Sequence, residues 1–453
     1  MILIPKGLAR SFRAAARKCS VARSKGPVPP VIIIPAHDSL KLATIVEGVI
    51  LTTAIPQTER ASQKLIVPME VLEAVDGAAV ELTVEGLKGK AQWESREGPQ
   101  SRDFVALMPG KQHDLPESPE SFTSISAVFL PAFHECGKTA LREPSRYALQ
   151  RIQLNGKAGS VVATDGKSAL IWKGFTFPFK ESLLVPAIPV FGCKDMGSAT
   201  EVRVGQTEDH LVIGAGIWTV WLPIDKSGRF PDVTSLAPRS QDASVVGIDD
   251  QDAAVLVASI PDLPPDEETG AITLDTHQGV VVRARASRTE KAHEVRLRRS
   301  TFAGPPARVA VNRLHLARAL ALGCRSIRLI PGKPMVAEGS DRTFIAVTLD
   351  DGHVVAPEIP APIKPPRRML PVKPIESNGI GTVLPPKLEV LTNGVEALDP
   401  LMEAEGLRTA LAEALHRANR LIQSLKQLRR QRRVMQSAWT SLKSLGLPSG
   451  GDS

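Results

Sequence analysis

Three stretches of the chain have the hydrophobic pattern and the β-branched residues expected of β-strands. These stretches are residues 42–51, residues 162–172, and the pair 271–275 and 279–284. The triplets Leu42-Ala43-Thr44 and Val162-Ala163-Thr164 open the first two stretches, 120 positions apart. Similarity at a fixed spacing is typical of an internal repeat, so the sequence predicts one structural unit used three times.

Segments with helical spacing of apolar residues flank each strand block. Helices are predicted before the blocks, at residues 8–19, 127–140 and 249–260, and shorter ones after them, at 67–72, 185–190 and 309–322. Further strands are predicted at 79–84, at 201–204 with 210–213, and at 326–330 with 344–349. The predicted class is α+β, with each sheet covered on one face by helices and able to join its neighbour edge to edge. Three unrelated α+β domains of similar size are the alternative.

The repeat divides the 453 residues into three domains, at 1–120, 121–240 and 241–352, followed by a linker and a helix. The linker, residues 353–395, has seven prolines between Pro357 and Pro374 and is predicted to be extended. The helix, residues 396–445, repeats apolar residues at spacings of four and three, at Leu407, Leu411, Ala414, Ala418, Leu421, Leu425 and Leu428. It forms either a coiled coil or an amphipathic helix folded back on the domains.

Positive charge concentrates near the N-terminus of a chain whose formal net charge is +8. No Asp or Glu precedes Asp38, whereas Arg10, Arg13 and Arg17 recur at helical spacing and therefore share one face. A solvated face without a partner, or an organellar transit peptide, would have a similar composition. The residues predicted to bind DNA phosphates are Arg10, Arg13, Arg17, Lys18, Arg23 and Lys25, with Lys138, Arg142, Arg313 and Arg318 as weaker candidates.

Acidic residues argue against DNA contact by all the predicted helices. The helix at 249–260 carries Asp249, Asp250 and Asp252. More acid follows it, at Asp262, Asp266, Glu267 and Glu268. Such a cluster would repel phosphate if it faced DNA.

Chemistry beyond binding has no support in the sequence. The four cysteines lie far apart, without the spacing of a zinc site or a disulfide framework, and neither a phosphate-binding loop nor a Gly-x-Ser-x-Gly elbow is present. His134, Glu135 and Cys136 are adjacent on a predicted helix and point in different directions, which makes a poor metal site. We therefore predict no catalytic residue, no metal and no cofactor. The longest apolar runs are too short for a membrane span, and we expect a cytoplasmic protein.

Four motifs, taken in order, carry a family resemblance. Residues 161–170, which contain Ala163-Thr164-Asp165-Gly166, resemble a turn in the middle domain of bacterial DNA sliding clamps, the beta subunit of DNA polymerase III. Gly228-Arg229-Phe230-Pro231-Asp232, continuing to Pro238, is similar to that family's exit from the middle domain. Asp114-Leu115-Pro116 and the Lys333-Pro334 dipeptide match further family positions, so the resemblance covers roughly residues 1–350.

The resemblance implies that two chains pair head to tail in a homodimeric ring of six units, with helices inside and sheets outside. The ring would enclose double-stranded DNA in the nucleoid, without reading bases, and tether the replicative polymerase and the clamp loader. The implied pocket for partner peptides comprises Thr164, Gly166, Lys167, Ala169, Pro238, Val347 and Leu349. Lys167-Ser168-Ala169 stands where the family has His-Arg-Leu, so the pocket should be shallower. A clamp-derived scaffold that binds partners without enclosing DNA is the alternative.

Overall fold

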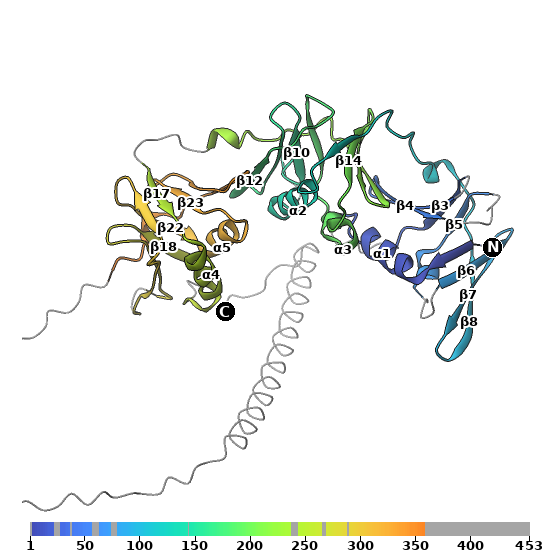
Figure 1. Cartoon of the computed structure of the whole chain (residues 1–453), viewed down its shortest axis with the longest axis horizontal. Helices are drawn as coiled ribbons and strands as arrows, with labels where there is room; N and C mark the ends of the chain where they lie inside the picture. The colour runs from blue at the N-terminus through green and yellow to red at the C-terminus, as the bar shows by residue number, and fades with distance from the viewer. Residues whose placement is uncertain are drawn as a thin grey trace, which may run out of the picture. The chain divides into compact units, whose positions relative to one another are not determined.

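Three consecutive segments of the chain order their strands in the same way. The computed structural model describes residues 2–21, 28–36, 39–56, 63–73, 79–143, 145–236, 243–264, 269–287 and 290–357. The predicted helix at 396–445 and most of the linker lie outside these residues. We name residues 2–105, 123–223 and 244–346 the first, second and third segments (Figure 1).

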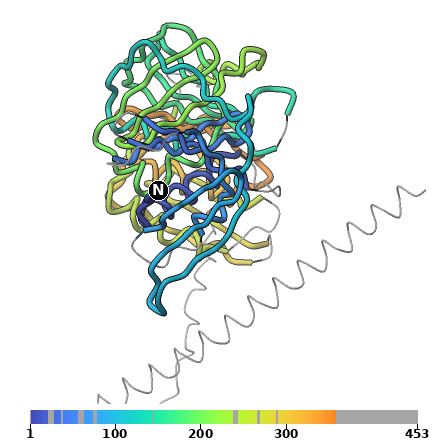
Figure 2. The backbone as a smooth tube through the Cα atoms, turned by 90° about the vertical axis from the view of Figure 1, so that its right-hand side faces the viewer, coloured from blue at the N-terminus to red at the C-terminus, as the bar shows by residue number. Residues whose placement is uncertain are grey.

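The first segment contains two four-stranded groups. Its elements are β1 (Ile2–Pro5), α1 (Lys6–Ala16), β2 (Val31–Pro35), β3 (Ser39–Val46), β4 (Val49–Pro56), β5 (Leu65–Val67), the 3-10 helix η1 (Met69–Leu72), β6 (Ala79–Glu85), β7 (Lys88–Ser95) and β8 (Gly98–Val105). The strand orders are β1-β6-β7-β8 and β5-β2-β3-β4. The long hairpin of β7 and β8 projects from the segment (Figure 2).

The second segment repeats both orders, as β9-β14-β15-β16 and β13-β10-β11-β12. Its elements are β9 (Thr123–Ile125), α2 (Phe129–Thr139), β10 (Arg151–Asn155), β11 (Ser160–Thr164), β12 (Ser168–Lys173), β13 (Ser182–Pro186), η3 (Pro189–Gly192), α3 (Lys194–Gly197), β14 (Val202–Gln206), β15 (His210–Ala215) and β16 (Trp218–Pro223). A further 3-10 helix, η2 (Lys111–His113), precedes the segment and another, η4 (Thr234–Leu236), follows it.

The third segment has the orders β17-β23-β24-β25, extended by β21, and β22-β18-β19-β20. Its elements are β17 (Ser244–Gly247), α4 (Asp250–Ser259), η5 (Ile260–Asp262), β18 (Ala271–Asp275), β19 (Val281–Ala284), β20 (His293–Arg296), β21 (Thr301–Ala303), β22 (Arg308–Asn312), α5 (Arg313–Ala321), β23 (Ser326–Leu329), β24 (Met335–Glu338) and β25 (Arg342–Ala346). The 3-10 helix η6 (Asp351–His353) follows it.

Two antiparallel joints merge the sheets of neighbouring segments. At the first joint β4 pairs with β16, and Leu51 lies opposite Val220. At the second joint β12 pairs with β25, and Leu170 lies opposite Phe344. Strand β8 has the same place in its strand order as β16 and β25, and β20 has the same place as β4 and β12. Neither takes part in an internal joint, and each lies at the edge of its four-stranded sheet.

The two faces of each sheet are buried in different ways. On the face that we call the helix face, α1, α2, α4 and α5 contribute to one large hydrophobic core, which includes Phe12 and Phe129. On the opposite face, which we call the connector face, the chain that leaves each segment crosses the sheet. In the described part of the chain these connectors are residues 106–122, 224–236 and 347–357.

The first two connectors bury apolar side chains on the sheet. Leu115 packs against clusters that include Ile32 and Ile66, and Phe122 joins the cluster of Val212 and Trp221. In the second connector, Phe230 and Val233 pack with Val162, Ala169, Ile171, Val336 and Ile345. The cluster of Trp221 also contains Ile50, and the cluster of Phe230 contains residues of the second and third segments, so each of these connectors covers a joint as well as a sheet.

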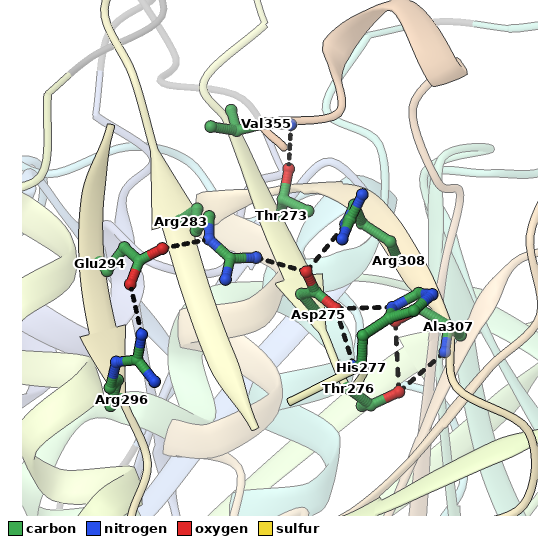
Figure 3. A network of polar contacts seen from close by, with 10 residues as sticks. All are labelled: Thr273, Asp275, Thr276, His277, Arg283, Glu294, Arg296, Ala307, Arg308 and Val355. Carbon is green, nitrogen blue, oxygen red and sulfur yellow. Dashed lines mark hydrogen bonds and ion pairs between the residues drawn. The ribbon is translucent and has the colours of Figure 1, made fainter. Parts of the chain in front are cut away.

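The third connector crosses an ionic surface instead (Figure 3). Asp275 and Arg283, each with a side chain 3% exposed, form an ion pair there, and Arg308 donates to the same carboxylate at 2.8 Å. Burial by itself would raise the pKa of Asp275, but hydrogen bonds from His277, Arg308 and Arg283 outweigh it and lower that pKa to about 2. The backbone N–H of Val355 donates to Thr273 Oγ1 at 2.8 Å and fixes the connector over this surface.

Two sequence predictions about the segments were wrong in detail. Leu42 lies on the helix face and Val162 on the connector face, so the spacing of 120 positions aligns residues on opposite faces of their sheets. A shift of one residue in a strand reverses the direction of every side chain, and the apolar residues on both faces concealed that shift.

The second predicted helix of each unit also begins in a strand. Val67 ends β5, Val185 lies in β13 and Val309 in β22. These residues are β-branched, which favours strands over helices. The helical turn comes afterwards, and only α5, at Arg313–Ala321, has the length of a regular helix.

Replacing Asp252 tests how strongly the third segment depends on one buried carboxylate. Its Oδ2 accepts hydrogen bonds at 2.8 Å from the N–H groups of Arg299 and Ser300 and from the Ser300 hydroxyl. We expect Asp252→Asn to lower the free energy of unfolding by about 2 kcal/mol in urea titrations at pH 7, because all three donors lose their charged acceptor.

The same variant predicts a pH dependence. Burial by itself would raise the pKa of Asp252, but the hydrogen bonds from Ser300 and Arg299 outweigh it and lower that pKa. Because this pKa is lower in the folded state than in the unfolded state, the ionised carboxylate stabilises the protein above the unfolded-state pKa. That stabilisation is lost in acid, so the difference in free energy of unfolding between variant and parent should narrow below about pH 4. Asp250→Asn is the matched control, because that side chain is 86% exposed. An equal loss in both variants would contradict the prediction.

Candidate functional site

Helix α1 carries the predicted basic face. It begins after Pro5, and its buried side contains Ala9, Phe12, Ala15 and Ala16. Arg10 and Arg17 lie on the exposed side, and Arg13 and Lys18 are partly buried. The predicted DNA-binding residues Arg23 and Lys25 lie outside the described residues.

An acidic residue far away in the sequence lies beside this face. Glu73, which follows η1, forms ion pairs with Arg13 and, at 3.3 Å, with Arg17. The absence of acid before Asp38 therefore did not predict the electrostatic surroundings of α1. Arg10 is the exposed arginine of the helix that Glu73 does not neutralise.

Lys18 lies where the first segment meets the second. It is close to Cys193, which follows η3, and it counteracts the rise that burial causes in the pKa of that thiol. Lys18 is therefore partly engaged within the protein.

The weaker basic candidates divide into structural and exposed residues. Arg313 donates to the carbonyl oxygens of Leu263 and Pro264, and Arg318 donates at 2.8 Å to the Glu135 carbonyl and to Thr139 Oγ1. Arg318 thus links α5 of the third segment to α2 of the second. Lys138 is half-exposed and pairs with Glu135 at 2.6 Å, and Arg142 is exposed.

The acid of α4 has mostly internal partners. Asp249 caps the helix by accepting from the N–H groups of Gln251 and Asp252. Asp250 pairs with Arg325 at 2.7 Å, and Asp252 is buried by the contacts described above. The predicted repulsion of phosphate by these three residues is therefore weaker than the sequence indicated; Asp266, Glu267 and Glu268 lie outside the described residues.

The adjacent residues His134, Glu135 and Cys136 point in three directions. The His134 ring packs so closely on Gly192 that a Cβ there would lie 2.2 Å from it. Glu135 pairs with Lys138, and the Cys136 thiol is buried 3.6 Å from the Val161 carbonyl oxygen. The three side chains do not converge on one point.

The turn predicted to border a peptide pocket has a defined internal geometry. Gly166 adopts a φ of 87°, which favours glycine, and its N–H donates to Thr164 Oγ1 at 3.1 Å. Asp165 Oδ1 accepts from the N–H groups of Lys167 at 2.8 Å and Ser168 at 2.6 Å. These bonds fix the turn that joins β11 to β12.

Only some of the predicted pocket residues are accessible. Lys167 and Gly166 are exposed, and the Val347 N–H donates to the Lys167 carbonyl at 2.9 Å, so the turn and the third connector meet. Leu349 lies one step further along, where its N–H donates to the Ala310 carbonyl at 2.8 Å. Thr164 and Ala169 are buried in the sheet, and Pro238 lies outside the described residues.

A hollow of about 430 Å³ near this turn was not predicted from the sequence. Tyr147, Gln150, Arg146, Arg151 and Arg229 line it, and the neighbouring Leu149 lies beside Gly166. Arg151 is held by Asp225 at 3.1 Å, whereas Arg146 and Arg229 are exposed. The signal in the sequence is the Gly228-Arg229 dipeptide, which also belongs to the family motif.

The strand orders and the two joints define the class of fold, which is that of the bacterial DNA sliding clamps. The chain is similar to the DNA polymerase III subunit beta from Pseudomonas aeruginosa, with 19% identity and a TM-score of 0.63 over 77% of this chain and 99% of that one. The resemblance read from the sequence is therefore confirmed as one of fold.

Clamp structures from other bacteria match equally well. The DNA polymerase III beta subunit from Thermotoga maritima is 13% identical, with a TM-score of 0.62 over 77% of this chain and 98% of that one. The subunit from Borrelia burgdorferi is 11% identical, with a TM-score of 0.63 over 77% and 97%. No protein-family model and no curated protein sequence matches the chain.

Within the described part of the chain, every helix is too short or too polar to cross a membrane.

Proposed function

We propose that two copies of the chain close head to tail into a ring and act as a DNA sliding clamp. The observation that carries this proposal is the position of β8 and β20. They are the counterparts of the strands at the two internal joints, and both lie at sheet edges. A second copy offers the matching edge at each end, which is the condition for a closed cyclic assembly.

The internal joints suggest the register of the joint between copies. At both of them, apolar residues of the helix face lie opposite each other, Leu51 with Val220 and Leu170 with Phe344. Phe104 and Val295 pack against the same core on β8 and β20. If Phe104 pairs with Val295 of the partner subunit in antiparallel order, Asp103 lies opposite Arg296 of the partner subunit, and their opposite charges favour this register.

The exposure of β8 also supports pairing. All of residues 99–103 are exposed, although the strand is eight residues long. An unpaired edge of that length exposes backbone donors and acceptors and promotes association with another strand. The Phe104 ring lies over Gly89, where a Cβ would be 2.3 Å from it. The side chain on the helix face of this edge is therefore already packed within one chain.

DNA would occupy the centre of the ring, with the helices facing it and the sheets forming the outer wall. Arg10, Arg17 and Lys138 are exposed cations on or next to α1 and α2 and would contact phosphates without reading bases. Arg13, Lys18, Arg23 and Lys25 remain proposed DNA contacts. In this arrangement the protein is a non-catalytic processivity factor of the cytoplasm.

The partner site would lie around the turn at residues 164–169. Lys167, Val347 and the hollow beside Leu149 offer an exposed cation, an apolar side chain and polar groups to a peptide. The replicative polymerase and the clamp loader are the proposed partners. Pro238 and Leu349 complete the proposed pocket.

A second function is favoured by one contact. Because Glu73 pairs with Arg13 and Arg17, the basic face of α1 is weaker than its sequence indicates. A clamp-derived scaffold that holds partner proteins without enclosing DNA is consistent with such a face. The two functions differ in whether DNA is held topologically.

Charge reversal tests the proposed joint. Arg296→Asp and Asp103→Arg should each weaken self-association about tenfold, because each places two like charges opposite one another. Sedimentation equilibrium should give twice the chain mass of 48.6 kDa for the parent chain and a lower average mass for each variant. The double variant should recover association; a monomeric parent, or a double variant weaker than both single ones, would contradict the joint.

The role of Glu73 can be measured by salt dependence. Glu73→Gln releases Arg13 and Arg17, so DNA affinity should increase, and the slope of log K against log salt should steepen by about one to two. Glu70→Gln is the control: the same charge is removed from an exposed residue of η1 that, in the described part of the chain, forms no ion pair with Arg13 or Arg17. Equal effects of both changes would indicate that only net charge matters.

Topological retention separates the clamp from the scaffold. After loading, the protein should remain on nicked circular DNA through a wash at about 0.5 M salt, because a closed ring does not depend on ionic contacts. Linearising the same DNA should release it. Equal loss from circular and linear DNA would favour the scaffold.

A further inference from the structure

The three connectors leave their segments in the same way. Two residues after β8 ends, the Leu107 N–H donates to the Ile66 carbonyl at 2.8 Å; two residues after β16 ends, the Asp225 N–H donates to the Leu184 carbonyl at 2.8 Å. In the third connector the bridge is between Thr348, two residues after β25, and Val311. Each connector therefore starts on the outermost strand of its own segment, which is β5, β13 or β22.

The first connector then continues across a joint. Leu115, ten residues after the end of β8, packs with Ile32 and Ile66 of the first segment. Phe122, seventeen residues after that end, packs with Val212 and Trp221 of the second segment. The connector thus covers the seam between β4 and β16.

The third connector follows the same course as far as it is described. Val355, nine residues after the end of β25, is 5% exposed and bound to Thr273. The residue seventeen positions after that end, the counterpart of Phe122, is Ile363. The stretch 358–363 reads Glu-Ile-Pro-Ala-Pro-Ile, which has two large apolar side chains and two prolines.

The surface that would receive this stretch lies on the first segment. Val105 follows Phe104 of the helix face and therefore lies on the connector face of β8, as Trp221 does beside Val220 on β16. Trp221 is 5% exposed under its connector, whereas Val105 is 64% exposed. A hollow of about 580 Å³ lies beside Val105, lined also by Thr83, Lys88, Lys90 and Asp103.

We propose that residues 358–363 of each chain cross the β8–β20 joint and lie on the connector face of the partner's first segment, with Ile363 against Val105 of the partner subunit. This inference rests on the proposed head-to-tail dimer. The C-terminal extension then begins as a third connector that binds in trans. The occupant is specified by its length, by its apolar residues, and by continuity with two connectors that cover equivalent seams.

Disulfide trapping in the full-length chain tests the contact. In a Cys193→Ser background, the other native cysteines are buried. Val105→Cys combined with Ile363→Cys should give a covalent dimer on mild oxidation, seen on non-reducing gels and reversed by a thiol. Val105→Cys with Ser377→Cys is the matched control, because residue 377 lies beyond the proposed contact.

A second cysteine pair separates failure of this contact from failure of the dimer. Asp103→Cys with Arg296→Cys reports the β8–β20 joint itself. If that pair crosslinks and the 105–363 pair does not, or if the Ser377 control crosslinks equally, the trans connector is wrong and the dimer stands. Crosslinking of 105 to 363 within one chain would also overturn it. If neither pair crosslinks between chains, both proposals fail.

A substitution measures what the contact contributes. Ile363→Asp should weaken self-association about tenfold, because a buried aliphatic side chain is replaced by a charge. Ile375→Asp, twelve residues further along, makes the same exchange outside the proposed contact and should leave association unchanged. Equal association constants for Ile363→Asp and the parent chain would overturn the inference.

Discussion

At each of the two internal joints of this protein, half-sheets from neighbouring segments pair strand to strand. The constraint is that backbone N–H and C=O groups at a sheet edge need partners, and β4, β16, β12 and β25 satisfy it within one chain. The merged sheets share one core on their helix faces, and each offers its connector face to a connector. The helices, the connectors and the turn beside Val347 all take their positions from these two joints.

The sequence predicted the elements better than it predicted their faces. The helices at α1, α2 and α4 and the order of the family motifs follow from apolar periodicity and from turn residues such as Asp165 and Gly166. The 120-residue spacing misaligned Leu42 and Val162 because both faces of these strands are apolar, which removes the alternation that fixes register. Val309 was assigned to a helix because short apolar runs fit both periods.

The candidate site depended on contacts that no local pattern contains. Glu73 is separated from Arg13 by sixty residues, so the neutralisation of α1 required the fold. Asp252 was predicted to repel phosphate if it faced DNA, yet three donors from the loop after β20 surround it. The motif around Phe230 was found by resemblance alone; its physical reason is that Phe230 and Val233 cover the second joint.

The two internal joints differ from a joint between chains in one thermodynamic respect. Connectors tether β4 to β16 and β12 to β25, so each pairing is closed at an effective concentration that linkers of this length set on the order of millimolar. No connector links β8 of one molecule to β20 of another, so the pairing of these two strands depends on protein concentration. On dilution, an assembly built this way separates at the untethered seams first, while each three-segment arc stays intact.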